Sequence, residues 1–324
     1  MNNNRVRMLS VAVAALLVLS FALGASAKDA FPAKPIRIIN YVAPGGLMDV
    51  TTRKFTDVAS KYTKAVFVVE NRSGAGGLVG MEYVLGQPAD GYTIFAPTTS
   101  VVIQVVSTNS SVDKYVWGFE WVSMLMKDPE CIISNSKLPI NDWADIAKDA
   151  KAKGGKQIWV GPSTGGNDHL MAMKVWDKAG ISAMWIPFES GPKAMAALMG
   201  GQGVAYVGNP ADTMGRPDLK VCAVSSDKRL KQYPDAPTFR ELGLAGLDDE
   251  IMWRGFAVRK GTSPEAIAWL QDLVEKVAKD PEWKTFFEEQ AIEVVAYKTG
   301  EFTRFVKKDL EDAQKYFKQF GIIK

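Results

Sequence analysis

The chain has 324 residues, of which 47% are hydrophobic and 23% are charged, a composition typical of a soluble globular protein. Its formal net charge of +3 falls to +1 without residues 1–27, which contain two arginines and no acidic residue. A near-neutral chain gives no reason to expect nucleic-acid binding, and its length suits one large domain or two smaller ones.

The first 27 residues are predicted to be an export signal rather than part of the fold. Arg5 and Arg7 form a positively charged start, residues 9–24 are apolar, and Ala25-Ser26-Ala27 has the small residues of a signal-peptide cleavage site. The apolar run is short for a membrane anchor. We therefore expect cleavage after Ala27 and a mature protein in the periplasm.

Two strands near the start of the mature chain each lead into a glycine-rich turn and then a helix. A buried strand is expected over 36–42, followed by the turn 43–46, and a second over 65–69, followed by the turn 70–77. Such turns direct free backbone N–H groups and the positive end of a helix dipole at one point. This arrangement suits the binding of an anion.

The same alternation of strands and helices continues along the chain. The further strands are expected over 92–96, 121–125, 131–133, 157–160, 184–188, 204–207 and 221–224. The further helices are expected over 140–152, 167–178, 192–199, 272–278, 283–290 and 302–320. This order predicts an α/β protein whose sheets are mainly parallel and flanked by helices.

Two places where the chain changes domain can be predicted. Asp128-Pro129 interrupts a strand, which suggests a crossing into a second domain, and the chain is expected to return between 234 and 256. We assign residues 28–129 and 235–324 to domain 1 and residues 130–234 to domain 2. Because ligands bind beyond the C-terminal ends of parallel strands, the cleft is expected between the domains, which could close by hinging.

The two cysteines leave their pairing open. Export makes a disulfide between Cys131 and Cys222 chemically possible, and both residues lie in short apolar strands. A free cysteine is also often a small buried apolar residue. Sequence alone does not give the facing geometry that a disulfide requires.

The motifs for catalysis, metals and dinucleotides are weak. Ser163 matches a nucleophile elbow, but the one histidine, His169, lies on the helix that follows it instead of far downstream. Val79 stands where a dinucleotide fingerprint needs glycine, and one histidine with two distant cysteines cannot form a zinc site. The acidic run 248–250 is interpreted as a solvated loop rather than a calcium site. We expect no enzyme activity, no cofactor and no metal.

Several blocks of the chain resemble one family in their order and spacing. The chain is similar to the extracytoplasmic solute-binding receptors of tripartite tricarboxylate transporters. The blocks that carry the resemblance are Pro35-Ile36-Arg37-Ile38-Ile39, Ala43-Pro44-Gly45-Gly46 with Asp49, Val69-Glu70-Asn71-Arg72, Gly74-Ala75-Gly76-Gly77, Asp90-Gly91-Tyr92-Thr93, Ser163-Thr164-Gly165-Gly166 with His169-Leu170, Gly200-Gly201-Gln202, Ala236-Pro237-Thr238 with Glu241-Leu242-Gly243, and Trp253-Arg254-Gly255.

The resemblance implies a fold, a ligand class and partners. The fold is the two-domain periplasmic-binding-protein fold, type II-like, with the ligand in the cleft between the domains. The implied function is capture of a small organic carboxylate (a di- or tricarboxylate, an acidic amino acid or an aromatic acid) and its delivery to the membrane subunits of a secondary transporter. In this family the ligand is held by backbone amides, hydroxyls and bridging waters. We expect a monomer.

The expected ligand-binding residues lie at the turns after strands and in the first turns of helices. They are Tyr41, Pro44, Gly45, Gly46, Met48, Asp49, Ala75, Gly76, Gly77, Thr98, Thr99, Ser163, Thr164, Gly166, Asn167, His169, Glu189 and Asn209. Asp49 is also explained as a helix-capping residue. Arg254, which follows the family's tryptophan, is an alternative ionic anchor for the carboxylate.

The chain departs from the family pattern at two turns. Leu47-Met48 follows the first glycine turn where small or polar residues are expected, and Glu189 stands where a basic residue is expected. Glu189 could cap the next helix or face an amino or hydroxyl group of a ligand. Two other functions stay open: a sensory receptor of the same fold that signals to a partner, and a secreted serine hydrolase that uses Ser163.

Overall fold

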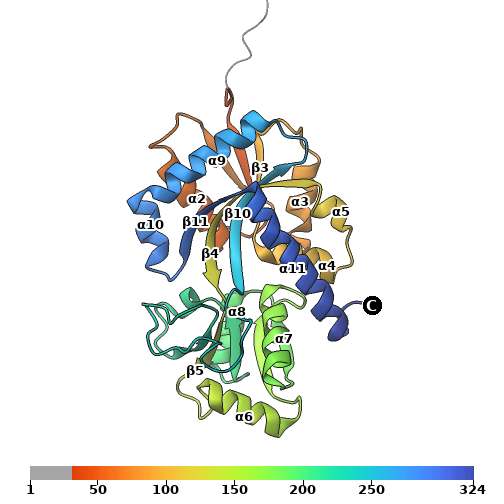
Figure 1. The fold of residues 1–324 in the computed structure, drawn as a ribbon, viewed down its shortest axis with the longest axis vertical. Helices are drawn as coiled ribbons and strands as arrows, with labels where there is room; N and C mark the ends of the chain where they lie inside the picture. Colours follow the sequence, from red (N-terminus) through yellow and green to blue (C-terminus); the bar gives the residue numbers. More distant parts are fainter. Residues whose placement is uncertain (1–30) are drawn as a thin grey trace, which may run out of the picture. The chain divides into compact units, whose positions relative to one another are not determined.

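The computed structural model describes residues 31–324. The predicted export signal and its cleavage after Ala27 lie outside the described residues. Two β-sheets, each flanked by helices, make up the fold (Figure 1). Within the described part of the chain, no helix has both the length and the apolar character that a membrane span requires.

The first sheet has six strands in the order β11-β4-β10-β3-β1-β2. Its strands are β1 (Ile36–Asn40), β2 (Phe67–Asn71), β3 (Thr93–Ala96), β4 (Phe119–Pro129), β10 (Ile251–Arg259) and β11 (Glu293–Lys298). The inner strand β1 is rich in β-branched residues and almost entirely buried, as its sequence predicts. It runs parallel to both neighbours, so that Ile38 lies opposite Val69 and Ile94.

The helices beside this sheet come from both ends of the chain. They are α2 (Leu47–Ala59), η1 (Ala75–Gly77), α3 (Leu78–Leu85), α4 (Thr99–Ser107), α5 (Val112–Tyr115), α9 (Pro264–Lys279), α10 (Pro281–Glu288) and α11 (Thr299–Gln319). On α2 the apolar residues Phe55 and Val58 share one face, and both are fully buried. The Phe55 ring meets Phe256 of β10 edge to face, with 4.8 Å between the ring centroids.

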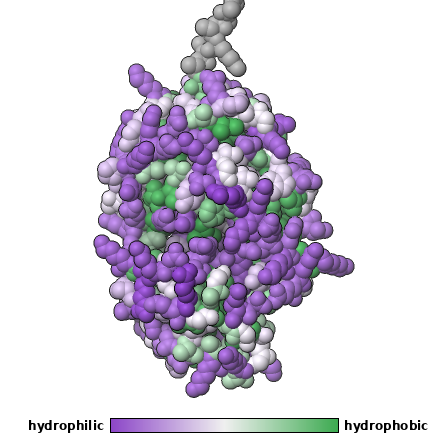
Figure 2. All heavy atoms as spheres, in the orientation of Figure 1, coloured by the Kyte–Doolittle hydropathy of each residue, from purple (hydrophilic) through white to green (hydrophobic). Residues whose placement is uncertain are grey.

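The second sheet has five strands in the order β7-β6-β8-β5-β9. Its strands are β5 (Cys131–Asn135), β6 (Ile158–Pro162), β7 (Met184–Phe188), β8 (Ala205–Gly208) and β9 (Leu219–Val224). The helical segments beside it are α6 (Trp143–Lys153), α7 (Asn167–Ala179), α8 (Gly191–Met199) and η2 (Pro210–Thr213). Figure 2 shows one face of the molecule, which is mostly hydrophilic and interrupted by smaller apolar patches.

The α/β fold with two sheets is confirmed, but the prediction of mainly parallel sheets is wrong, because both sheets are mixed. Strands β1–β3 and β6–β8 form parallel pairs, whereas β4, β5, β9, β10 and β11 pair antiparallel. The reason is that β4 runs out of the first sheet toward β5, and β10 returns beside it in the opposite direction. Ile251 accordingly lies opposite Pro129, and Arg259 opposite Phe119.

The strands of the first sheet come from both sides of the segment that forms the second. Asp128 and Pro129 do not interrupt a strand as expected; they are the last two residues of β4, and only Glu130 separates them from β5. Strands β10 and β11 and helix α4 were not predicted; Arg254 and Gly255 weaken the local signal of β10, and the β-branched residues of α4 are untypical of a helix. The domain boundaries at 129/130 and 234/235 stay a prediction.

The two cysteines are free and buried. Cys131 packs with Ile133 and Val160, whereas Cys222 belongs to the separate core cluster that contains Ile132. The Cys222 Sγ lies 2.9 Å from the Ser134 hydroxyl. Both thiols therefore act as small buried groups within the sheet, the second of the two interpretations that the sequence allows.

Candidate functional site

A cavity of about 620 Å³ lies between the turns that follow strands of the two sheets. Residues after β1, β2 and β3 line one side of it, and residues after β6 and β7 line the other. Its lining residues are Tyr41, Val42, Ala43, Pro44, Gly45, Gly46, Ser73, Gly74, Gly76, Gly77, Ser100, Gln104, Pro162, Ser163, Gly166, Asn167, Asp168, Glu189, Ser190, Gly191, Pro192 and Met252. The cavity thus lies at the C-terminal ends of parallel strands, where α/β sheets bind ligands.

Four helices begin at this cavity with no side chain capping their first turn. The N-cap residues of α2, α3, α7 and α8 line the cavity, and none makes a side-chain cap hydrogen bond; they are Gly46, Gly77, Gly166 and Ser190. The first N–H groups of a helix have no partner within the helix. At these four helices they are available to a ligand, together with the positive ends of the helix dipoles, with three exceptions. Leu78 N–H donates to the Ala75 carbonyl, Asp168 N–H donates to its own carboxylate, and Pro192 has no N–H.

Most helices that begin elsewhere are capped by a side chain. Asp142, Ser263 and Asp280 accept hydrogen bonds from first-turn N–H groups of α6, α9 and α10. Helix α11 is the exception, because its N-cap Lys298 has no suitable acceptor. Uncapped starts therefore gather at the cavity, although they are not confined to it.

Three of the glycine N–H groups expected to contact a ligand are already used inside the turns. Gly45 N–H donates to Asp49 Oδ2 over 3.0 Å, Gly46 N–H donates to the Ala43 carbonyl over 3.2 Å, and Gly77 N–H donates to Gly74 over 2.9 Å. These bonds fix the turns, and the next N–H group at α3, that of Leu78, is also used, because it donates to the Ala75 carbonyl. Gly45, Gly46 and Gly77 are therefore not free donors, whereas Gly76 and Gly166 stay predicted ligand contacts.

Gly77 is also required for a steric reason. Its φ of +105° lies in the region that disfavours side chains, and an added Cβ would lie 2.8 Å from Val101 Cγ1 and 3.0 Å from Tyr41 Cδ2. Tyr41 lines the cavity and forms a 2.6 Å hydrogen bond with the Thr98 hydroxyl. A side chain at residue 77 would thus displace the wall of the cavity.

The described lining residues include two acids and no lysine or arginine. Glu189 lies at the rim, where its side chain is 80% exposed and forms an ion pair with Lys193 that lowers the pKa of Glu189. Asp168 is 5% exposed. Burial, and then the neighbouring carboxyl of Asp212, raise the pKa of Asp168 well above its usual value.

Arg254 does not line the cavity and is paired inside the protein. It is 3% exposed, and its guanidinium donates to Asp128 Oδ2 over 2.9 Å. Burial raises the pKa of Asp128 to about 6, and Arg254 opposes this shift. The alternative in which Arg254 anchors a carboxylate ligand therefore finds no support in the geometry, since Arg254 already neutralises Asp128.

Ten of the predicted binding residues line the cavity: Tyr41, Pro44, Gly45, Gly46, Gly76, Gly77, Ser163, Gly166, Asn167 and Glu189. Eight do not: Met48, Asp49, Ala75, Thr98, Thr99, Thr164, His169 and Asn209. These eight were expected at the ligand because they follow strand ends. In the structure, most of their side chains instead contact other parts of the protein.

Asp49 illustrates this supporting position. Its carboxylate accepts hydrogen bonds from Gly45 N–H, Asn40, Asn71 and Arg53. Burial raises the pKa of Asp49, but the bonds from Arg53, Gly45 and Asn71 outweigh it, so the net effect is a lower pKa. Asp49 organises the turn between β1 and α2, but the prediction that it is the N-cap is wrong, because Gly46 is the N-cap and Asp49 is the third residue of α2.

The other supporting residues hold backbone segments or lie outside. The Thr99 hydroxyl accepts from Trp253 N–H over 2.9 Å, and the Asn209 amide donates to the Pro129 carbonyl over 3.0 Å. Thr98 caps α4 and bonds Tyr41, and Met48 is 2% exposed within the core. Ala75 and Thr164 are exposed beyond the cavity.

His169 is not placed to activate Ser163. Its Nδ1 accepts a 3.1 Å hydrogen bond from Gly165 N–H, and its ring stacks on Trp185 with 4.8 Å between centroids. Burial lowers the pKa of His169 to about 4. Ser163 has a positive φ of 54°, as a nucleophile elbow does, but no side chain among residues 31–324 forms a hydrogen bond with its hydroxyl. The serine-hydrolase alternative therefore lacks its base.

Some lining residues were missed, and the sequence contained signals for part of them. Ser100 follows the hydroxyl pair Thr98-Thr99, and Asp168 follows Asn167 in the same first helical turn. Gln104 lies one turn further along α4, and Met252 lies on β10, neither of which was predicted as an element. Only the tertiary structure brings these two residues to the cavity.

Together, two helix-flanked sheets with a cavity at their strand ends define a binding protein of the two-domain periplasmic type. A solved structure described as a periplasmic transporter has this fold, with a TM-score of 0.81 and 26% identity, covering 90% of this chain and 99% of that chain. Residues 51–322 match the family model described as "Tripartite tricarboxylate transporter family receptor". The chain belongs to this family, as the resemblance in its sequence predicts.

Two further proteins similar to this chain are informative. Protein BugT of Bordetella pertussis is 29% identical over 272 residues, which cover 82% of this chain and 83% of BugT. The structure of MatC from Rhodopseudomonas palustris with bound malate is 19% identical, with a TM-score of 0.75, and covers 88% of this chain and 99% of MatC. At 19% identity, this comparison shows that MatC has the same fold as this chain and nothing more.

Proposed function

We propose that this protein is a periplasmic receptor that binds a small organic carboxylate and delivers it to the membrane subunits of a tripartite tricarboxylate-type transporter. The observation that carries the proposal is the convergence of four uncapped helix starts on one cavity. Backbone N–H groups and helix dipoles favour an anion there. The malate bound to MatC, which has the same fold, is in keeping with this ligand class.

The way in which charge is held suits a receptor that must release its ligand. No lysine or arginine among the described residues lines the cavity, so the anion would be held by hydrogen bonds from N–H groups and hydroxyls. Each hydrogen bond to a charged group contributes about 1.5–3 kcal/mol. Several of them give useful affinity for the carboxylate without a lysine or arginine beside it.

A thermal-shift screen of organic acids tests the proposal. A ligand at 100 times its dissociation constant should stabilise the protein by about 2.7 kcal/mol, and the amide of the same acid, which lacks the charge, should not. A panel in which acids and their amides raise the melting temperature equally would argue against anion capture. Hydrolysis of model esters that is lost in Ser163→Ala would instead favour an enzyme.

A further inference from the structure

Asp168 is a carboxylate at the cavity whose charge the protein does not balance directly. It lies in the first turn of α7, lines the cavity and is 5% exposed. Its own backbone N–H is its hydrogen-bond donor. In the part of the chain that the structure describes, no side chain donates a hydrogen bond to it and no lysine or arginine lies within ion-pair distance. A buried charge left in this way is costly, so the carboxyl group holds a proton more firmly unless a ligand's positive charge pairs with it.

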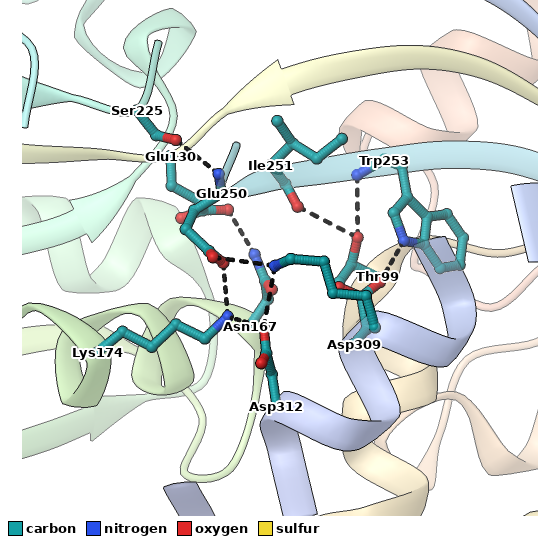
Figure 3. Close-up of polar contacts among 11 residues, drawn as sticks. Thr99, Glu130, Asn167, Lys174, Ser225, Glu250, Ile251, Trp253, Asp309 and Asp312 are labelled. Atoms are coloured by element: carbon teal, nitrogen blue, oxygen red, sulfur yellow. Dashed lines mark hydrogen bonds and ion pairs between the residues drawn. The ribbon is translucent and has the colours of Figure 1, made fainter. Parts of the chain in front are cut away.

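The groups behind Asp168 make its surroundings more acidic. Asp128 and Glu130 are at most 1% exposed, and Asp212 is held by the Tyr206 hydroxyl and Asn209 N–H. Glu130 accepts a hydrogen bond from the Asn167 amide through one oxygen (Figure 3), while its other oxygen, Oε2, is buried without a partner. The carboxyl groups of Asp128, Glu130, Asp168 and Asp212 thus lie in one buried region.

Among the described residues, two cations act on these four acids, and neither is bonded to Asp168: Arg254, and Arg216, which acts on Asp212. Arg254 influences Asp128, Asp168 and Asp212, but its hydrogen bond goes to Asp128. Burial, followed by the charge of Asp168, raises the pKa of Glu130 well above its usual value. The region therefore favours positive charge, and the cavity side of Asp168 is the place where a ligand could supply it.

We propose that the ligand is a zwitterion of the amino-acid type, whose protonated amine pairs with Asp168 while its carboxylate binds the uncapped helix starts. This deepens the proposed function and rests on it. The cavity then has two opposite electrostatic ends: N–H groups and helix dipoles for the carboxylate, and the Asp168 carboxylate for the amine. Glu189, the residue first considered for an amino group, is excluded because it is exposed and paired with Lys193.

A second role for Asp168 has to be separated from this one. An acid in the first turn of a helix interacts favourably with the helix dipole whether or not a ligand is present. That role alone would leave the receptor indifferent to an amine on its ligand. The preference between acids that differ only in the amine therefore distinguishes the two roles.

The test is titration calorimetry with matched probes on the wild-type mature protein and on Asp168→Asn. The probes are three pairs that differ only in the amine: propionate and alanine, succinate and aspartate, and glutarate and glutamate. Malate, which has a hydroxyl in place of the amine of aspartate, is the neutral comparison. In a pair that binds, we expect the wild type to bind the amine-bearing acid about ten- to a hundredfold more tightly, as one charge-assisted hydrogen bond allows. In Asp168→Asn this preference should vanish, while the amine-free acid binds at least as tightly as before. Glu189→Gln, the control at the other lining acid, should keep the preference.

Each outcome has one meaning. Equal binding of both members of every pair by the wild type overturns the inference and leaves the proposed function in place. Equal binding of malate and aspartate overturns it too, because the neutral hydroxyl of malate would then bind as well as the protonated amine of aspartate. If Asp168→Asn weakens the binding of both members of a pair to the same extent, Asp168 only interacts with the dipole of α7 and does not bind the amine. If no organic acid raises the melting temperature in the wider screen, the proposed function fails and the inference with it. The wild-type comparison holds even if Asp168→Asn does not fold.

Discussion

The Nζ atom of Lys174 on α7 lies 2.6 Å from Oδ2 of Asp312 on α11, and this ion pair joins helices that flank different sheets (Figure 3). Lys174 is 3% exposed and also lies 2.6 Å from Glu250, just before β10. Lys308 of α11 contacts the same two acids. Because Glu250 N–H donates to Ser225 and its carbonyl accepts from Glu130 N–H, the ion network is fixed to the segments that cross between the sheets.

Replacing Lys174 with methionine should lower the free energy of unfolding by about 3 kcal/mol, because it leaves two partly buried carboxylates with one cation. Lys308 remains beside both acids, which keeps the loss at the lower end of the range for broken buried pairs. Urea unfolding measures the change. The matched control is Lys284→Met, whose exposed pair with Glu288 spans 3.7 Å and should contribute at most about 0.5 kcal/mol. Equal losses in the two variants would contradict a role for burial.

His169 should make the protein less stable as the pH falls from 7 to 5. Its pKa is about 4 in the folded state and about 6.5 in the unfolded state, so below pH 6.5 the unfolded chain binds the extra proton. The sign is therefore a loss of stability on acidification, of about 2 kcal/mol between pH 7 and pH 5.

The variant His169→Asn isolates this contribution. Asparagine can still accept the hydrogen bond from Gly165 N–H, but it does not titrate. The difference in unfolding free energy between wild type and variant should shrink as the pH falls from 7 to 5. The nearby carboxyl groups are the same in both proteins, so their contributions cancel in this difference. A difference that stays constant over this range would mean that His169 is not held neutral by burial.

Gly77→Ala should weaken ligand binding as well as stability. The substitution forces a side chain into a positive φ, which costs about 1–2 kcal/mol, and pushes the new Cβ against Val101 and Tyr41. Gly243→Ala is the control, because Gly243 also has a positive φ, of +79°, but has no atom within 4 Å of the added Cβ. Calorimetry with the best acid of the screen should show reduced affinity for Gly77→Ala alone. Unchanged affinity would mean that the start of α3 does not contact the ligand.

Ligand binding should make the protein more compact. The cavity has walls from the turns of both sheets, so a ligand that contacts both walls favours their approach. Small-angle scattering of the mature protein with and without a saturating acid should show a smaller radius of gyration with the acid. A radius that does not change at saturation would speak against closure by a hinge.

The local sequence was sufficient to predict the repeating units of the fold. Strands β1 and β6 are short apolar runs with β-branched residues, and each ends at a glycine-containing turn before a helix. These signals depend on residues close together in the chain, so they can be recognised without knowing which other segments each strand packs against. Since the turns follow the strands directly, the sequence also predicted that Gly46, Gly77 and Gly166 would border the ligand cavity.

Only the tertiary structure decided which side chains face the cavity and how the charges are paired. The acidic run 248–250 suggests a solvated loop, yet Glu250 joins Lys174 and Lys308, which lie far away in sequence. Arg254 weakens the local signal for β10, but across the sheet Asp128 neutralises it. Asp168 looks like an ordinary first-turn acid until the fold places it beside Glu130 and the cavity. Burial and charge pairing arise from contacts between distant segments, and for this reason local patterns determined the elements while the folded chain determined the chemistry of the site.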